Sequence, residues 1–318
     1  MKKIIVTAIG SFSAKCVITN LKENGYFVLG TDIYPGDWHY ETKICDDFYQ
    51  VPLATMTKEY IDTLLKISGS KGIDSILPLT DLEIDVLNEH RNSFEKMGIK
   101  LLMPSKEVLD VSRDKFKLYS LFKDDTFVPS IPTTTKLEEI RTEDYPILAK
   151  PRSGRSSEGI IKMETAEFLP LLKGRKDYIF QKILDGVIVT VDYVRSSKTG
   201  NDFMISRQEL LRTKNGAGLT VKLFNDVNLN KIVSHIGNKL HINGCINMEF
   251  ILYDNNYFLI DINPRFSAGV AFSCKAGYDM VTSNMKCYNE EDILAPLSYP
   301  EQIMTKTYIE EVTKIFDH

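Results

Sequence analysis

Two carboxylates near the end of the chain are spaced to share one face of a β-hairpin. The segment 245–263 contains two strand-forming apolar runs around a polar turn at 254–256, a pattern typical of a hairpin. A three-residue turn places Glu249 opposite Asp261, and Asn263 then falls on the same face. A two-residue turn would shift the register by one and send the two carboxylates to opposite faces.

Carboxylates that oppose each other in this way lie only ~4.5–5.5 Å apart at Cβ and repel, so they need a positive charge nearby. A side chain such as Arg265 could neutralise Glu249 and Asp261. Alternatively, the two carboxylates and the Asn263 amide could hold Mg²⁺, which prefers hard oxygen ligands. A plain hairpin with its charges on a solvated face is the third interpretation.

A second cluster of charged residues follows a strand in the middle of the chain. Lys150 lies near the end of the apolar run 145–151, and the glycine- and serine-rich loop 152–159 follows directly, with Arg152 and Arg155 in it. Backbone N–H groups and hydroxyls in such a loop can surround phosphate oxygens. A simple connection between strands 147–151 and 159–163 is the alternative, but it has no need of three cations.

The first hundred residues predict an α/β domain. Apolar runs at 3–8, 26–30 and 74–77 are typical of buried parallel strands, and helical patterns, such as that at 81–90, alternate with them. A last strand before residue 104 ends this alternation, and a helix at 114–122 follows.

The remainder indicates antiparallel β-structure. Strands are expected at 177–186, 187–195 and 203–211, followed by a helix at 227–241. The last thirty residues predict a peripheral strand and a terminal helix.

A dinucleotide site in the first domain is an alternative with a weak motif. Asp32 ends the second strand about 20 residues after Gly10, like the acidic residue that binds ribose in dinucleotide folds. Phe12 and Ser13, however, stand where further glycines would be needed.

Composition excludes several classes of protein. With 318 residues the chain is long enough for two or three domains, and its net charge of −4 provides no basic field for nucleic acid or an anionic membrane. The five cysteines show no metal-binding spacing. No apolar run is long enough to span a bilayer. We therefore expect a cytoplasmic protein with reduced thiols.

Several motifs in order resemble the ATP-grasp enzymes, in particular the large chain of carbamoyl-phosphate synthase and biotin carboxylase. The motifs are Asp114-Lys115, the run 150–159, the run 181–184, the run 190–192, Glu249, and the run 261–265. The resemblance implies a combined α/β and α+β fold, with an N-terminal Rossmann-like parallel-sheet domain before a two-lobed ATP-grasp fold with antiparallel sheets. We place the N-terminal domain at 1–103, linker helices and the small lobe at 104–186, and the large lobe with the metal hairpin at 187–318.

The resemblance also implies roles for individual residues. Catalysis is expected from Arg265 and Lys150. Magnesium ligands are expected at Glu249, Asp261 and Asn263. Contacts to ATP are expected from Lys115, Leu148, Lys150, Ser153, Gly154, Arg155, Ser156, Ser157, Gly159, Gln181, Lys182, Ile183, Leu184 and Ile251. The family often has a ribose-binding glutamate near the position of Ile188. This chain therefore departs from the family pattern at the expected ribose contact.

The implied activity is ligation of a small carboxylate to an amine or similar nucleophile through an acyl phosphate, with release of ADP and phosphate. ATP and Mg²⁺ are the implied cofactors, with Mn²⁺ as an alternative metal, and a homodimer is the family-level expectation. Arg207 and Arg212 are further candidates for facing the substrate. A module that binds ATP without turnover and a nicotinamide-dependent enzyme are the alternatives.

Overall fold

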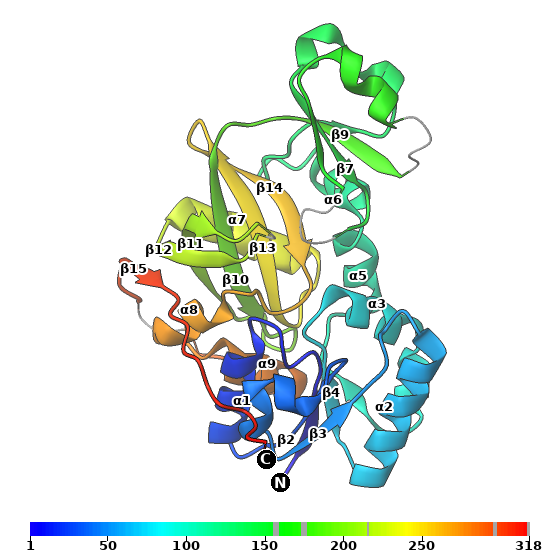
Figure 1. The fold of residues 1–318 in the computed structure, drawn as a ribbon. Coiled ribbons are helices and arrows are strands. Elements are labelled where there is room, and N and C mark those ends of the chain that lie inside the picture. The colour runs from blue at the N-terminus through cyan, green and yellow to red at the C-terminus, as the bar shows by residue number, and fades with distance from the viewer. Residues whose placement is uncertain (155–158, 173–176, 215, 295–297, 317–318) are drawn as a thin grey trace.

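The chain folds around three β-sheets that follow one another in sequence. The computed structural model describes residues 1–154, 159–172, 177–214, 216–294 and 298–316. The N-terminal parallel sheet lies at one end of the molecule in Figure 1, the small antiparallel sheet at the other, and the largest sheet beside them. The expected mixture of α/β and α+β structure is confirmed.

The N-terminal sheet has the order β3-β2-β1-β4-β5, and all its described pairs are parallel. Ile4 and Val6 of β1 belong to the core that contains α1, whereas Ile5 belongs to the core with α2. Helices thus cover both faces, which explains the continuous apolar runs. The elements are β1 (Lys3–Val6), α1 (Ala14–Glu23), β2 (Phe27–Asp32), η1 (Gly36–Trp38), η2 (Tyr40–Lys43), β3 (Asp47–Gln50), α2 (Thr57–Lys71), β4 (Ser75–Leu77), α3 (Asp81–Glu89), α4 (Arg91–Glu95) and β5 (Lys100–Leu101).

Two helices lead from this sheet to the small antiparallel sheet of order β6-β9-β7-β8. Asp114 caps the second helix by accepting bonds from the backbone N–H groups of Phe116 and Lys117. The elements are α5 (Lys106–Ser112), α6 (Lys115–Phe122), β6 (Thr133–Thr134), η3 (Leu137–Glu139), η4 (Thr142–Asp144), β7 (Ile147–Pro151), β8 (Ile161–Met163), η5 (Ala166–Leu172) and β9 (Tyr178–Lys182).

The large antiparallel sheet has the order β14-β13-β10-β11-β12-β15. Helix α7 packs on one face, so closely that a Cβ at Gly237 would lie 2.0 Å from Tyr193 Oη. Helices α8 and α9 pack on the other face and share a core with α1. The elements are β10 (Val187–Arg195), β11 (Asp202–Arg212), β12 (Gly218–Phe224), α7 (Val227–Lys239), β13 (Gly244–Tyr253), β14 (Asn256–Asn263), α8 (Val270–Lys275), α9 (Met280–Tyr288) and β15 (Gln302–Thr305).

The β13–β14 hairpin reaches the expected pairing by an unexpected route. Its turn has two residues, Asp254 and Asn255, both with positive φ, as the tightest hairpin turns require. The three-residue turn was therefore wrong. A β-bulge at Ile260 then adds one residue to β14, which restores the register and leaves Glu249 paired with Asp261.

The C-terminal segment is also different from the expectation. Strand β15 is present at the edge of the large sheet, but residues 306–316 contain no helix, so the predicted terminal helix was wrong. This segment runs toward the N-terminal sheet (Figure 1), where Lys43 Nζ donates to the Val312 carbonyl. A short helix is marginal in water unless an apolar face is buried, and most of the apolar side chains of this segment are exposed.

Candidate active site

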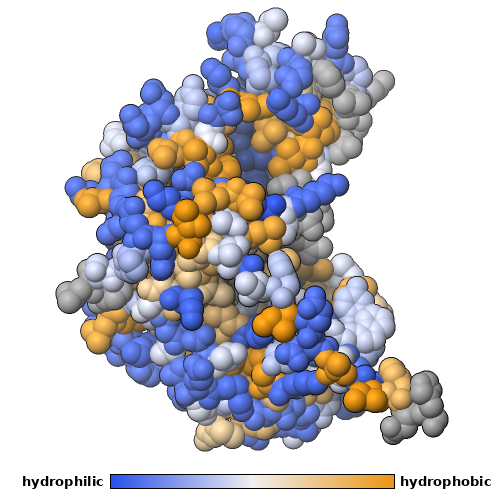
Figure 2. Space-filling model, turned by 60° about the vertical axis from the view of Figure 1, so that its left-hand side comes forward, coloured by the Kyte–Doolittle hydropathy of each residue, from blue (hydrophilic) through white to orange (hydrophobic). Residues whose placement is uncertain are grey.

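A cavity of about 660 Å³ lies where the three sheets meet. The surface is hollowed below the lobe that carries β7 and β9 (Figure 2). The walls of the cavity come from the loop before α1, from the start of α3, from α6, from β7 and β9 of the small sheet, and from β10, β11, β13 and β14 of the large sheet. The sequence-predicted residues that line it are Lys115, Leu148, Lys150, Gly154, Gln181, Lys182, Ile183, Leu184, Glu249, Ile251, Asp261, Asn263 and Arg265.

Lys150 is a buried cation in this wall, with 7% of its surface exposed. It lies near the end of β7. Burial is the main cause that lowers the pKa of its ammonium group to about 8; nearby Lys115 acts in the same direction, whereas Asp261 and Glu249 oppose the shift. A buried ammonium at this position is thus poised to gain from an anion in the cavity.

The opposed carboxylates of the hairpin each have a cationic neighbour. Lys115 Nζ lies 3.2 Å from Asp261 Oδ2, and Arg212 Nη2 lies 3.5 Å from Glu249 Oε1. Burial raises the pKa of Glu249, and the Asp261 charge adds to this rise although Arg212 opposes it. The repulsion expected between the two carboxylates is therefore present and only partly relieved.

The amide of Asn263 completes the hairpin face. Its Nδ2 donates to Asn247 Oδ1 at 3.1 Å, which turns the amide oxygen to other partners. The described residues contain no cluster of three or more His, Cys, Asp or Glu side chains that could hold a metal. Glu249, Asp261 and Asn263 supply two carboxylates and one amide, so Mg²⁺ here would take its remaining oxygens from water and phosphate, as it commonly does.

Arg265 forms its ion pair with Asp81 and not with a hairpin carboxylate, although its charge also acts to lower the pKa of Glu249. Its Nη2 lies 2.8 Å from Oδ2 of Asp81, which is the first residue of α3. Burial by itself raises the pKa of Asp81, but Arg265 and Arg113 outweigh burial and lower it, so this carboxylate is ionised. The direct cationic partners of the hairpin carboxylates are thus Lys115 and Arg212.

Each of the three guanidinium nitrogens of Arg207 donates to a partner within the protein. It donates to Asp192 Oδ2 at 2.7 Å, to Glu209 Oε1 at 3.1 Å and to Ser267 Oγ at 3.0 Å. A Cβ at Gly269 would lie 2.9 Å from its Nη2. The expectation that Arg207 faces a substrate is not supported, because its donors hold the wall of the cavity together.

The charges around the cavity pair almost one to one. Within the part of the chain that the structure describes, each acidic side chain of the lining has a basic partner in the same lining. The pairs are Asp261 with Lys115, Glu249 with Arg212, Glu209 with Arg207, and Asp81 with Arg265. Lys150 and the exposed Lys182 are the lining cations left without a carboxylate partner among these residues. Of the two, only Lys150 is buried.

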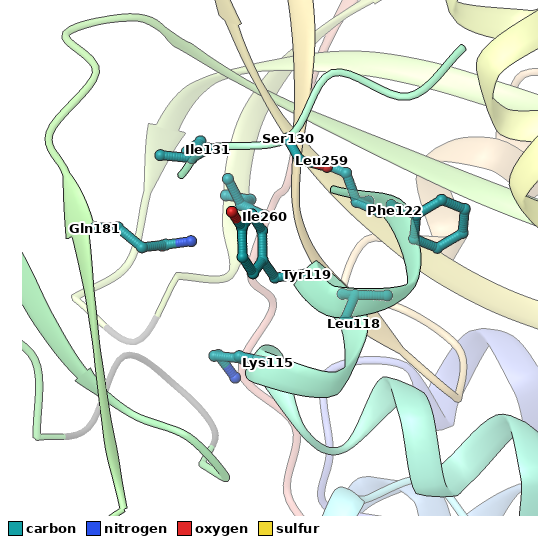
Figure 3. Close-up of a pocket in the computed structure, with 9 residues that line it drawn as sticks. All are labelled: Lys115, Leu118, Tyr119, Phe122, Ser130, Ile131, Gln181, Leu259 and Ile260. Carbon is teal, nitrogen blue, oxygen red and sulfur yellow. The ribbon is translucent and has the colours of Figure 1, made fainter. Parts of the chain in front are cut away.

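The end of the cavity beside β9 is less charged. Gln181 is buried and donates its Nε2 to Thr133 Oγ1 at 2.6 Å. Figure 3 shows Gln181 and Lys115 reaching from β9 and α6 toward a small pocket beside Tyr119 and Ile260. Leu148 and Ile251 line the main cavity as expected. This end therefore offers apolar surface next to a buried amide, which suits a flat heteroaromatic ring.

The glycine-rich loop is only partly described. Arg155, Ser156 and Ser157 lie outside the described residues. Gly154 lines the cavity, whereas Ser153 and Gly159 are not part of its lining. Arg152 is bound to the Asp114 carboxylate at 2.7 and 2.8 Å, so it anchors the start of the loop to α6.

The N-terminal domain offers little to a dinucleotide. Asp32, the residue which that alternative requires for ribose, is 6% exposed. Its carboxylate accepts hydrogen bonds from the backbone N–H groups of Gly10 and Tyr34, and it lies 3.2 Å from His39 Nε2. The carboxylate is therefore occupied in holding the first loops of the domain.

Sequence reasoning missed Asp81 and Glu209 as parts of the cavity wall. Asp192 belongs to the motif run 190–192, but its contact with Arg207 was not expected. Asp81 stands 184 residues before its partner Arg265. No local motif connects two residues so far apart.

Within the described part of the chain, no helix is long and apolar enough to cross a membrane.

Comparison with known proteins agrees with this architecture. A family model described as an ATP-grasp domain matches residues 112–269, and a model described as a PylC-like N-terminal domain matches residues 4–102. Residues 112–269 are therefore an ATP-grasp domain, and a PylC-like N-terminal domain precedes it.

Individual relatives are distant. The carbamoyl phosphate synthase large chain of Thermoplasma volcanium is 24% identical over 326 aligned positions, which cover 90% of this chain and 30% of that protein. The chain thus spans less than a third of that relative's length. The D-alanine–D-alanine ligase of Petrotoga mobilis is 25% identical, with 79% of this chain and 80% of that protein covered.

Among solved structures, the biotin carboxylase domain of the Hydrogenobacter thermophilus 2-oxoglutarate carboxylase, solved with MgADP and bicarbonate, has a TM-score of 0.76 and 20% identity. The match covers 95% of this chain and 73% of that chain. At this identity the likeness concerns the fold alone.

Proposed function

We propose that the chain is an ATP- and Mg²⁺-dependent ligase that joins a small carboxylate to an amine or similar nucleophile. Lys115 and Lys150 bind ATP phosphates, the run from Gln181 to Leu184 binds the adenine edge, and Leu148 and Ile251 pack on its faces. Glu249, Asp261 and Asn263 hold Mg²⁺, which neutralises phosphate charge when it is bound. Arg265 stabilises the group in transfer.

The observation that carries this proposal is Lys150. It is a buried ammonium in the cavity wall, the carboxylates around it are each paired with another cation, and its pKa is lowered to about 8 mainly by burial. Such a charge is stabilised when an anion enters the cavity. The opposed pair Glu249 and Asp261 beside it has the complementary need for a cation, so a metal–phosphate ligand satisfies both.

The proposed chemistry has two steps. A substrate carboxylate oxygen attacks the γ-phosphorus of ATP, the bond between that phosphorus and the β,γ-bridging oxygen breaks, and ADP leaves. The amine lone pair then attacks the acyl carbon, phosphate leaves with the bonding pair, and the amine loses a proton. Such transfers require positioning and charge stabilisation more than a protein nucleophile, which suits a cavity rich in lysine and arginine.

The relatives' names support this class of reaction without fixing the substrates. The proposal also includes the three domains 1–103, 104–186 and 187–318, whose limits lie between the sheets. A homodimer and a cytoplasmic location belong to the proposal as well; they rest on the family resemblance and on the cysteine pattern.

The experiment is a screen of amino acids and small carboxylates for ATP cleavage, followed by trapping. An active acid should yield ADP and phosphate, and hydroxylamine should give the hydroxamate of that acid when the amine is left out. Lys150→Ala should abolish trapping. The control is Lys162→Ala in β8, which removes an exposed lysine paired with Glu164 and should trap normally. AMP and pyrophosphate as products would contradict the acyl phosphate.

A further inference from the structure

The N-terminal domain supplies a buried carboxylate to the arginine of the proposed transfer site. Asp81 is 3% exposed, and both Asp81 and Arg265 line the main cavity. Resting on the proposed function, we propose that Asp81 is a positioning residue that holds the guanidinium of Arg265 in its working orientation. The domain before the ATP-grasp domain would then contribute directly to the rate of phosphoryl transfer.

The contact between the two residues has the features of a strong interaction. Asp81 Oδ2 lies 2.8 Å from Arg265 Nη2, while Arg265 Nη1 donates to the Phe266 carbonyl at 3.1 Å. Each of the two terminal nitrogens of the guanidinium thus has its own acceptor, one in each domain. A hydrogen bond between charged groups is stronger than a neutral one, and more so in a buried place.

A second arginine near Asp81 is satisfied elsewhere, which leaves the carboxylate to Arg265. Arg113 donates from Nε and Nη2 to the two oxygens of Asp85, both at 2.8 Å. Its Nη1 is farther from Asp81 Oδ1, at 3.5 Å. Asp85 follows Asp81 by one turn of α3, so the helix presents two carboxylates in line. Asp85 fixes Arg113, and Asp81 fixes Arg265.

Arg265 needs such a partner because a long arginine side chain has many rotamers and because other cations line the cavity beside it. Lys115, Lys150 and Arg212 line the same cavity, and a long arginine side chain with several rotamers would otherwise turn away from them. Holding the side chain before the reaction removes that reorganisation from the barrier. The geometry therefore makes Asp81 a determinant of kcat more than of ATP binding.

The kinetic test compares two carboxylates on one helix. Asp81→Asn should lower kcat about 10- to 100-fold with little change in KM for ATP. Asp85→Asn removes the bidentate partner of Arg113 but does not touch Arg265, and its kcat should stay within about threefold of the wild-type value. If both variants lose turnover equally, the positioning role is wrong.

Coupling between the residues makes the test specific. In the Arg265→Ala background, Asp81→Asn should cause no further loss of kcat, because its effect passes through Arg265, whereas the effect of Asp85→Asn should be the same in both backgrounds. If the fold-losses in kcat of Asp81→Asn and Arg265→Ala multiplied in the double variant, the proposal would be overturned. Asp81→Glu keeps the charge and moves it by one methylene, so it should fold and still lower kcat with KM unchanged. A wild-type kcat for this variant would equally contradict precise positioning.

A chemical readout separates this inference from the proposed function. Phenylglyoxal modifies accessible arginines, and the rate at Arg265 can be followed by mass spectrometry of its peptide, with Arg113 and Arg212 as internal references. Asp81→Asn should speed labelling of Arg265 several-fold, and Asp85→Asn should not. An unchanged Arg265 rate in Asp81→Asn would overturn the inference whatever the activity. Absence of ADP formation by the wild-type protein in the acid screen would instead contradict the proposed function alone.

Discussion

Two buried cations in the same cavity wall have opposite surroundings. Arg207, 2% exposed, is bound by Asp192, Glu209 and Ser267. Lys150, at the end of a strand in the small sheet, has no carboxylate partner among the described residues, and burial lowers its pKa to about 8. The first charge is neutralised inside the protein, whereas the second is exposed only to the cavity.

This difference distinguishes a cation that stabilises the fold from a cation that is available to a ligand. A buried ion pair that is already complete gains nothing from a ligand, and breaking it is costly because the remaining charge stays buried. A buried charge without a partner costs stability until an anion arrives. Arg207 therefore belongs to the framework of the cavity, and Lys150 to its chemistry.

The largest expected effect concerns Arg207. Arg207→Ala leaves the Asp192 carboxylate and the Glu209 carboxylate buried without their cation, so the free energy of unfolding should fall by about 3–5 kcal/mol. Urea unfolding followed by circular dichroism measures it. The control is Lys222→Ala on the adjacent strand β12, where an exposed lysine lies 3.9 Å from Glu301 and its loss should cost less than about 1 kcal/mol. Equal effects would remove the contrast between buried and surface pairs.

Lys150 should respond in the opposite direction. Because its folded-state pKa is lowered from 10.5 to about 8, folding favours the neutral amine, and below pH 8 the charged form carries the full penalty. Lys150→Met should therefore raise the free energy of unfolding by about 1–3 kcal/mol below pH 8, with turnover reduced at least about 100-fold.

The stabilising effect has its own pH dependence. Between pH 8 and 10.5 the wild-type protein regains stability, since Lys150 deprotonates in the folded state before it does in the unfolded state, and the advantage of Lys150→Met should shrink there. Thermal unfolding at several pH values provides the comparison. A destabilised Lys150→Met at pH 7 would mean that the lysine is already satisfied.

A smaller effect should distinguish the two hairpin carboxylates. Burial and the Asp261 charge raise the pKa of Glu249, so Glu249→Gln should stabilise the fold by roughly 0.5–1 kcal/mol. Asp261 lies 3.2 Å from Lys115, and Asp261→Asn should instead destabilise by a similar amount. Both variants should lose Mg²⁺-dependent activity. Full turnover by either variant at ordinary Mg²⁺ would exclude that residue as a metal ligand.

The sequence predicted the residues of the cavity better than the contacts between them. Glu249 and Asp261 follow from strand periodicity, and their pairing survived a wrong turn because the bulge at Ile260 compensated for the missing residue. Periodicity contains no signal for a bulge. The partner of Arg265 could not be predicted either, because Asp81 approaches it only after the N-terminal sheet and the large sheet have packed together. Asp192 contacts Arg207 across two neighbouring strands of the large sheet, and that contact depends on a strand register that periodicity alone does not determine.

The terminal segment shows the other limit. Its apolar spacing indicates a helix, but the sequence does not tell whether a surface exists to bury that face, and without such a surface a short helix gains little. The segment is instead tied to the N-terminal domain by Lys43 and by the ion pair of Lys314 with Asp37. Local pattern thus predicted the strands of the site and failed where tertiary contact decides.

The proposed function requires above all that Lys150 is the group that binds a phosphate. Calorimetric titration with MgATP at pH 8, in two buffers of different ionisation enthalpy, measures the protons taken up on binding. The wild-type protein should take up to about half a proton per ATP, because a half-charged Lys150 becomes fully charged beside the anion. Lys150→Arg, whose guanidinium is already fully charged at pH 8, should bind MgATP without that uptake. Equal uptake by both proteins, or none by the wild type, would contradict this role of Lys150.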